Sequence, residues 1–158
     1  PGAATFDPQE IPANTEGEVV FAPVSFGEKV YDTVAVNVGN SHCITFCDKV
    51  DDVDLENLGQ AVLASGMFPG IAYVECARIV NDLTIKLRVW DRVNGETMAC
   101  GTAAAAVVAA AVRAGKCARG KVITVKLRGG GLFVKCLDNG DLVLDGSVKQ
   151  SYEGVIEI

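Results

Sequence analysis

The sequence predicts an α+β domain: a curved mixed β-sheet of about eight strands wrapped around a central apolar helix. The run from Ala103 to Ala114 holds eight Ala, three Val and one Arg, which indicates a helix with no polar face. Several other segments show the two-residue alternation of strands. With 158 residues, 49% of them hydrophobic, the chain can enclose such a helix within one core.

Most of the chain is expected to form strands. Residues 1–18 hold three of the five prolines and predict an extended lead-in with turns. A hairpin is expected over residues 132–146, with a type I′ turn at Asn139 and Gly140. The remaining expected strands cover residues 30–38, 42–47, 72–80, 84–91, 121–127 and 151–158.

Two helices are expected. Asp54 is a natural N-cap for an amphipathic helix that starts at Leu55 and ends before Gly66. The Ala/Val helix should end at Gly115, a residue type that favours the position after a helix.

Composition excludes several classes of function. The formal net charge of −6 argues against a nucleic-acid partner, which needs a basic surface. The Ala/Val run is shorter than the ~20 apolar residues of a membrane span, and no signal peptide opens the chain. The six cysteines are scattered and His42 is the only histidine, so neither a disulfide framework nor a metal site is expected. A cytoplasmic protein with reduced thiols is the interpretation we favour.

Cys100 stands where the Ala/Val helix begins. A helix N-terminus presents unpaired N–H groups and partial positive charge, so it attracts a carboxylate or phosphate and favours a thiolate. Gly101 would let an anion approach the backbone, and Thr102 adds a hydroxyl donor. The residues alone leave two interpretations open: an acid/base or nucleophilic thiol, or a small core residue.

Four segments resemble the second half of diaminopimelate epimerase: "VAVNVGNSHCITF", "FPGIAYVECARI", "IKLRVWDRVNGETMACGTAAAAVVAAAVRAGK" and the closing "YEGVIEI". Members of this family convert LL-diaminopimelate to the meso form, for lysine and peptidoglycan precursor synthesis, without a cofactor. Two cysteines act on opposite faces of the α-carbon. The resemblance implies two similar lobes, with the active site between two helix N-termini. Residues 1–158 would then be the C-terminal domain, inactive without the N-terminal one.

The resemblance assigns roles residue by residue. Cys100 is implied to be one of the two catalytic cysteines, with Gly101 and Thr102 binding substrate. Asn40 matches a substrate-binding asparagine, and His42 matches a histidine that tunes the acidity of the cysteines.

Further roles follow from the segment before the helix and from the end of the chain. Asp91 stands for a glutamate that contacts the substrate amino group and also tunes cysteine acidity, and Arg92 matches the arginine that grips the distal carboxylate. Tyr73 occupies the position of an expected substrate-binding asparagine. Tyr152 matches a tyrosine at the contact of a homodimer. No metal and no cofactor are implied.

Several departures keep other functions open. Ser41 and Ala103 replace a usual proline and glycine, whereas Tyr73 and Asp91 favour a racemase or epimerase of a different amino acid. A cysteine nucleophile that forms covalent adducts would need a base, for which only His42 is available. A non-catalytic anion-binding module is the third alternative. The family's second cysteine lies in a motif absent here, and packing roles are expected for Cys43, Cys47, Cys76, Cys117 and Cys136.

Overall fold

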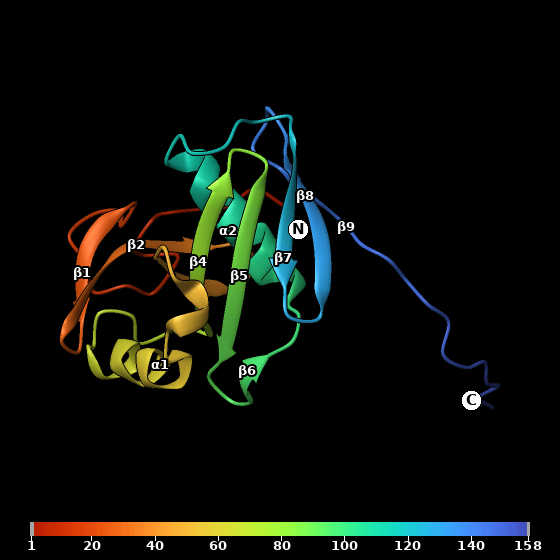
Figure 1. The fold of residues 1–158 in the computed structure, drawn as a ribbon, viewed down its shortest axis with the longest axis horizontal. Coiled ribbons are helices and arrows are strands. Elements are labelled where there is room, and N and C mark those ends of the chain that lie inside the picture. Colours follow the sequence, from red (N-terminus) through yellow and green to blue (C-terminus); the bar gives the residue numbers. More distant parts are fainter. Residues whose placement is uncertain (1, 158) are drawn as a thin grey trace.

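The computed structural model describes residues 2–157, which form one mixed sheet of nine strands with two α-helices (Figure 1). The strand order is β1-β2-β3-β4-β5-β7-β8-β9, and β6 pairs with β5 outside this path. Neighbouring strands are antiparallel except for the parallel pairs β3–β4 and β5–β7. The strands are β1 (Ala22–Phe26), β2 (Lys29–Asn37), β3 (Ser41–Phe46), β4 (Tyr73–Asn81), β5 (Thr84–Asp91), β6 (Gly95–Thr97), β7 (Val122–Leu127), β8 (Gly130–Cys136) and β9 (Leu142–Asp145).

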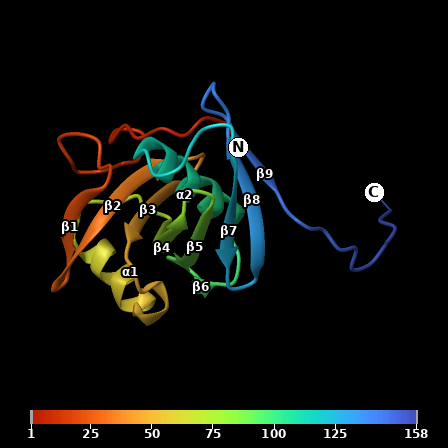
Figure 2. The same ribbon diagram turned by 45° about the horizontal axis from the view of Figure 1, so that its top comes forward.

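Helix α2 (Gly101–Arg113) is the centre of the larger core, as the Ala/Val run predicts. The sheet curves around it, with β2 on one side and β8 on the other (Figure 2). Residues 103–111 are all buried, because alanine and valine let the surrounding strands approach from every side. The helix ends where expected, since Gly115 has a φ of 74° and its N–H donates to the carbonyl of Val112.

Helix α1 (Leu55–Ala64) packs on the opposite face of the sheet. Alternate strand residues separate the two faces: Ile44 points to the α2 core and Cys43 to the α1 core. Asp54 caps α1 by accepting a hydrogen bond from the N–H of Asn57 at 3.1 Å, which confirms the expected helix start. A short 3-10 turn, Val50–Asp52, precedes the cap.

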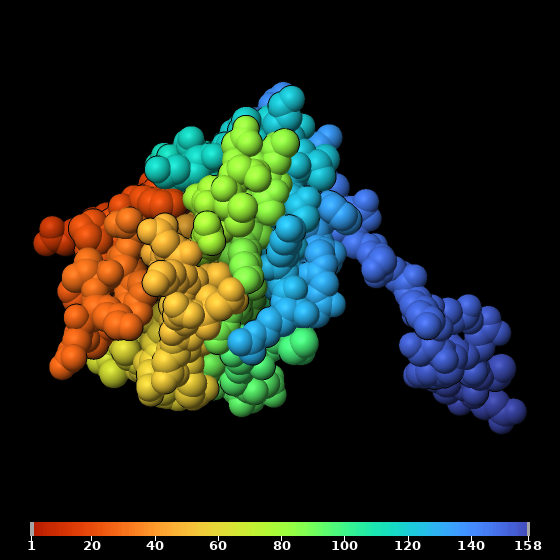
Figure 3. Space-filling model, viewed as in Figure 1, coloured from red at the N-terminus to blue at the C-terminus, as the bar shows by residue number. Residues whose placement is uncertain are grey.

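The fold class is confirmed, but the sequence missed two strands and misplaced one. β1 and the three-residue β6 were not expected. The strand expected at 151–158 is wrong over residues 151–157, which pair with no other strand; residue 158 lies outside the described residues. Residues 146–157 instead extend away from the domain as a tail (Figure 3).

The β8–β9 hairpin is confirmed, but its type I′ turn is wrong. Such a turn needs a positive φ at two consecutive residues, and Asn139 does not have one. Instead the N–H of Gly140 donates to the carbonyl of Leu137 at 2.9 Å, and Gly140 alone has a positive φ, 92°. Asp138, Asn139 and Gly140 thus form a three-residue loop with a glycine bulge, one residue longer than the loop of a type I′ turn.

Neither described helix has the length and hydropathy that a membrane span requires.

Candidate active site

Three neighbouring strands bring three of the expected residues into one row. β3 and β4 run parallel with His42 beside Tyr73, and β5 runs antiparallel to β4 with Asp91 beside Tyr73. The starts of β3 and β4 therefore meet the end of β5. The rings of His42 and Tyr73 stack, with 5.1 Å between their centroids and 14° between their planes.

Cys100 joins this row through a chain of polar contacts. It is half-buried and is the N-cap residue of α2, and its side chain makes no capping hydrogen bond. Its Sγ lies 3.4 Å from the hydroxyl of Thr102, which accepts a hydrogen bond from Nδ2 of Asn40 at 3.3 Å. The other end of the Asn40 amide, Oδ1, lies 3.1 Å from Nε2 of His42. Residues 62 apart in the sequence thus form one continuous network.

The network ends in a carboxylate that the sequence reading missed. Oε1 of Glu75 lies 2.5 Å from Nδ1 of His42, and neither side chain is exposed to solvent. Because Oδ1 of Asn40 can only accept, Nε2 of His42 carries a hydrogen. Burial raises the pKa of Glu75, while the charge and the hydrogen bond of His42 oppose that shift. Among residues 2–157, Oε2 of Glu75 has no hydrogen-bond partner.

The sequence did carry a signal for Glu75. It is a single carboxylate within the otherwise mostly apolar strand segment "YVECA", two residues after Tyr73 and therefore on the same face. A buried charge needs a partner, and the parallel register of β3 and β4 supplies His42.

Asp91 and Arg92 lie at the edge of the site. Oδ1 of Asp91 accepts hydrogen bonds from the N–H of Val93 at 2.7 Å and of Asn94 at 3.1 Å. These bonds, that from Val93 foremost, lower the pKa of Asp91, so its carboxylate closes the β5–β6 turn as an anion. The exposed Arg92 side chain reaches the carbonyl of Pro69 at 3.5 Å.

An open pocket of about 310 Å3 lies along this edge, lined by Tyr73, Asp91 and Arg92 among others. Burial raises the pKa of Tyr73, and the nearby charges of Cys100 and Asp91 act in the same direction. Tyr73 therefore belongs both to the row with His42 and to the lining of the pocket.

Gly101 lies at the start of the helix, as expected, whereas Tyr152 lies away from the site. Gly101 is the first residue of α2, and an added Cβ there would lie 3.0 Å from Cδ2 of Leu144, so this glycine keeps β9 close to the helix start. Tyr152 is not in the site: it lies in the tail with 87% of its surface exposed. The strand assigned to it is wrong, and its role in a homodimer stays a prediction.

Comparison with known proteins shows the family of the chain. The profile of the family "Diaminopimelate epimerase" matches residues 34–150, which include every expected site residue except Tyr152. The chain belongs to the diaminopimelate epimerase family. The diaminopimelate epimerases of Bacillus thuringiensis and Bacillus mycoides are each 39% identical over 158 residues. The alignment covers 99% of this chain but only 55% of each relative, so the chain spans about half the length of these enzymes.

Solved structures show the same fold at lower sequence identity. A predicted epimerase from Pseudomonas aeruginosa superposes with a TM-score of 0.59 at 18% identity, over 90% of this chain and 52% of its own. A hydroxyproline epimerase from Agrobacterium vitis, solved with bound trans-4-hydroxy-L-proline, has a TM-score of 0.58 at 14% identity, covering 79% of this chain and 44% of its own. The chain therefore shares its fold with these solved structures.

Proposed function

We propose that this chain supplies one of the two thiols of a cofactor-independent epimerase that inverts an α-carbon of diaminopimelate. The observation that carries the proposal is the position of Cys100. It is a half-buried thiol at the N-terminus of a buried helix, connected through Thr102 and Asn40 to the His42–Glu75 pair. Membership of the diaminopimelate epimerase family supports the substrate class.

The helix start is suited to an amino-acid carboxylate. The first hydrogen bond within α2 runs from the N–H of Ala104 to the carbonyl of Cys100 at 3.1 Å, so the N–H groups of residues 101–103 face outward from the helix end. These donors and the helix dipole stabilise a carboxylate, and more strongly the charge that spreads onto it when the α-proton leaves.

The reaction needs two sulfur atoms on opposite faces of the α-carbon. One thiolate takes the α-proton, the electron pair of the C–H bond delocalises into the carboxylate, and the second thiol delivers its proton to the other face. The net result is inversion with no change in oxidation state. Cys100 removes the α-proton in one direction of the reaction and delivers it in the other.

The second thiol comes from outside the residues described. Among residues 2–157, Cys43, Cys76, Cys117 and Cys136 are buried, and Cys47 follows the far end of β3 from His42. We expect the chain alone to show no turnover and the protein that also contains the first lobe to be active.

Hydrogen exchange tests the role of Cys100. The two-lobe protein, reduced, is incubated with LL-diaminopimelate in deuterated water, and proton NMR follows loss of the α-hydrogen signal. Cys100→Ala should slow exchange at least ~100-fold, because it removes one acid/base group. Cys47→Ala, which lies outside the site, is the matched control. Unchanged exchange in Cys100→Ala would refute the proposal.

Tyr73 supports a second candidate, an epimerase or racemase of another amino acid. Its phenol stacks on His42 where the family resemblance implies an amide, and a changed polar group strongly alters substrate selection. Exchange on another amino acid, with none on diaminopimelate, would favour this candidate. Tyr73→Asn should then shift the preference toward diaminopimelate.

A further inference from the structure

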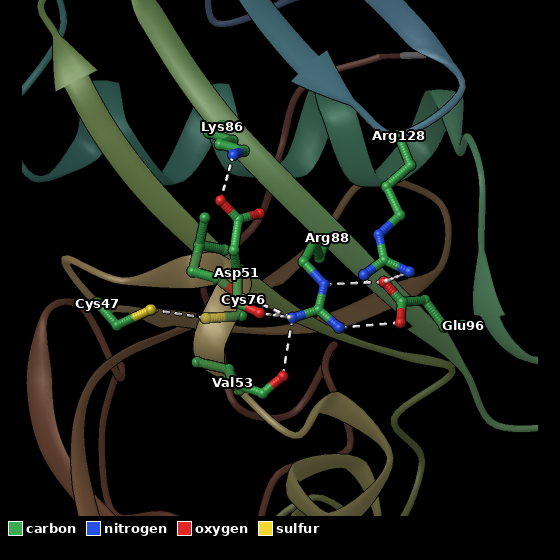
Figure 4. A network of polar contacts seen from close by, with 9 residues as sticks. Cys47, Asp51, Val53, Cys76, Lys86, Arg88, Glu96 and Arg128 are labelled. Carbon is green, nitrogen blue, oxygen red and sulfur yellow. Dashed lines mark hydrogen bonds and ion pairs between the residues drawn. The ribbon is translucent and has the colours of Figure 1, made fainter.

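Two thiols that the proposed epimerase chemistry does not use lie in contact on the α1 face of the sheet. Cys47 directly follows β3, and Cys76 lies in the neighbouring parallel strand β4. Their Sγ atoms are 2.8 Å apart (Figure 4). A disulfide bond is about 2.05 Å long, so bond formation needs the two sulfurs to approach by less than ~1 Å.

The two thiols differ in acidity. The hydrogen bond from Cys76 lowers the pKa of Cys47, and a backbone hydrogen bond with Lys49 and the charge of Arg88 act in the same direction. The same contact, together with burial, raises the pKa of Cys76 far above that of a free thiol. Cys47 is therefore the more acidic thiol of the pair.

Cys47 is also the more accessible of the two thiols. Cys47 is half-buried and lines an open surface pocket of about 390 Å3, together with Phe46, Arg78 and Lys116 among others. Cys76 is buried behind it. A small neutral oxidant that enters this pocket meets Cys47 first.

We propose that Cys47 and Cys76 form a reversible redox modification site, in which a hydroperoxide oxidises the pair to an intramolecular disulfide. The Cys47 thiolate attacks one peroxide oxygen, the O–O bond breaks, and hydroxide, or the alkoxide of an organic peroxide, leaves. The Cys76 sulfur then attacks the sulfur of the Cys47 sulfenic acid, the S–O bond breaks, and water leaves with the Cys76 proton. Two thiols are oxidised by two electrons, and the peroxide is reduced to water or to water and an alcohol.

The disulfide would link the residue after β3 to the fourth residue of β4. His42 and Tyr73 lie at or near the start of these strands, and Cys76 lies beside Thr45 on the sheet face opposite to Glu75. The pair is independent of Cys100, whose neighbour is the Thr102 hydroxyl rather than a second thiol. The inference therefore does not rest on the proposed function.

Peptide mapping tests the site directly. The fully reduced protein with its complete chain is treated with hydrogen peroxide, alkylated after unfolding, digested and analysed by mass spectrometry. We expect a Cys47–Cys76 cross-linked peptide and the loss of these two of the six alkylatable thiols in residues 1–158, with recovery after treatment with a dithiol reductant. The cross-link should form equally in Cys100→Ala.

Variants distinguish pairing from general oxidation. Cys76→Ser should abolish the cross-link and let Cys47 proceed to the sulfinic acid, whereas Cys43→Ala, a buried cysteine earlier on β3, should leave it intact. The peptide map of the wild-type protein tests the cross-link without depending on the folding of any variant. Two results would overturn the proposal. In one, Cys47 and Cys76 both remain alkylatable while Cys100 is oxidised. In the other, cross-links form among all the cysteines.

Discussion

One methyl group added at Gly59 tests how α1 is packed on the sheet beneath the active site. Gly59 is buried in α1, and a Cβ built there would lie 2.4 Å from Cδ2 and Cε3 of Trp90. The indole cannot shift freely, because its Nε1 donates to Oε2 of Glu56 at 2.6 Å and the ring is buried. Trp90 directly precedes Asp91 at the end of β5.

Two effects of opposite sign decide the outcome of Gly59→Ala. Alanine is favoured over glycine inside a helix by about 1 kcal/mol. Against this, overpacking costs ~1–3 kcal/mol, and a displaced indole would also weaken a hydrogen bond to a carboxylate worth ~1.5–3 kcal/mol. We expect a net loss of about 2 kcal/mol in the free energy of unfolding.

Urea unfolding measures this loss as a lower midpoint concentration at constant slope. Gly131→Ala is the control, because an added Cβ there meets no atom within 4 Å; it should change the free energy of unfolding by less than ~0.5 kcal/mol. In a Trp90→Phe background, Gly59→Ala should cost less. A Gly59→Ala protein as stable as the wild type would refute the reasoning.

Four further predictions concern buried charge and capping. The pKa of Glu75 is raised in the folded state, so the free energy of unfolding should decrease as pH rises above about 4.3. Thermal unfolding of Glu75→Gln, measured across pH, should lack that decrease. Glu96→Gln should act with the opposite sign: the hydrogen bond from Arg88 lowers the pKa of Glu96, so wild-type stability falls as pH drops below about 4.3, and the variant should lose less. Arg88→Met should reduce the free energy of unfolding, measured in urea, by about 3 kcal/mol. Arg88 is 7% exposed and donates hydrogen bonds to both Glu96 carboxylate oxygens. A change below ~1 kcal/mol would contradict this prediction. Asp54→Ala should cost about 1 kcal/mol in the same assay through loss of the α1 cap, and no change would show that the cap bond contributes nothing.

The sequence predicted the fold where local pattern and burial agree. Helix α2 was evident because an all-apolar run of helical length has to be surrounded. β6 could not be found in this way, because it is three residues long and exists through its pairing with β5. The tail shows the converse: "VIEI" has strand-like composition, but its described residues, 155–157, pair with no strand of residues 2–157.

The site was predictable only in part. The structure brings Cys100, Asn40 and His42 into one network, whereas the roles that the family resemblance implies for them stay predictions. Glu75 and the contact between Cys47 and Cys76 depend on the register between β3 and β4, which strand periodicity alone does not define.

The alanine content of α2 has a consequence for how accurately the site is held. Alanine has no side-chain rotamers to freeze, so enclosing residues 103–106 costs backbone entropy alone. Longer side chains would have to find one packing arrangement before the helix axis could settle, whereas here the strand side chains pack against a nearly smooth cylinder. The backbone of Cys100 is thus held by the packing of the whole helix, and only the torsion of its own short side chain is left to place the sulfur.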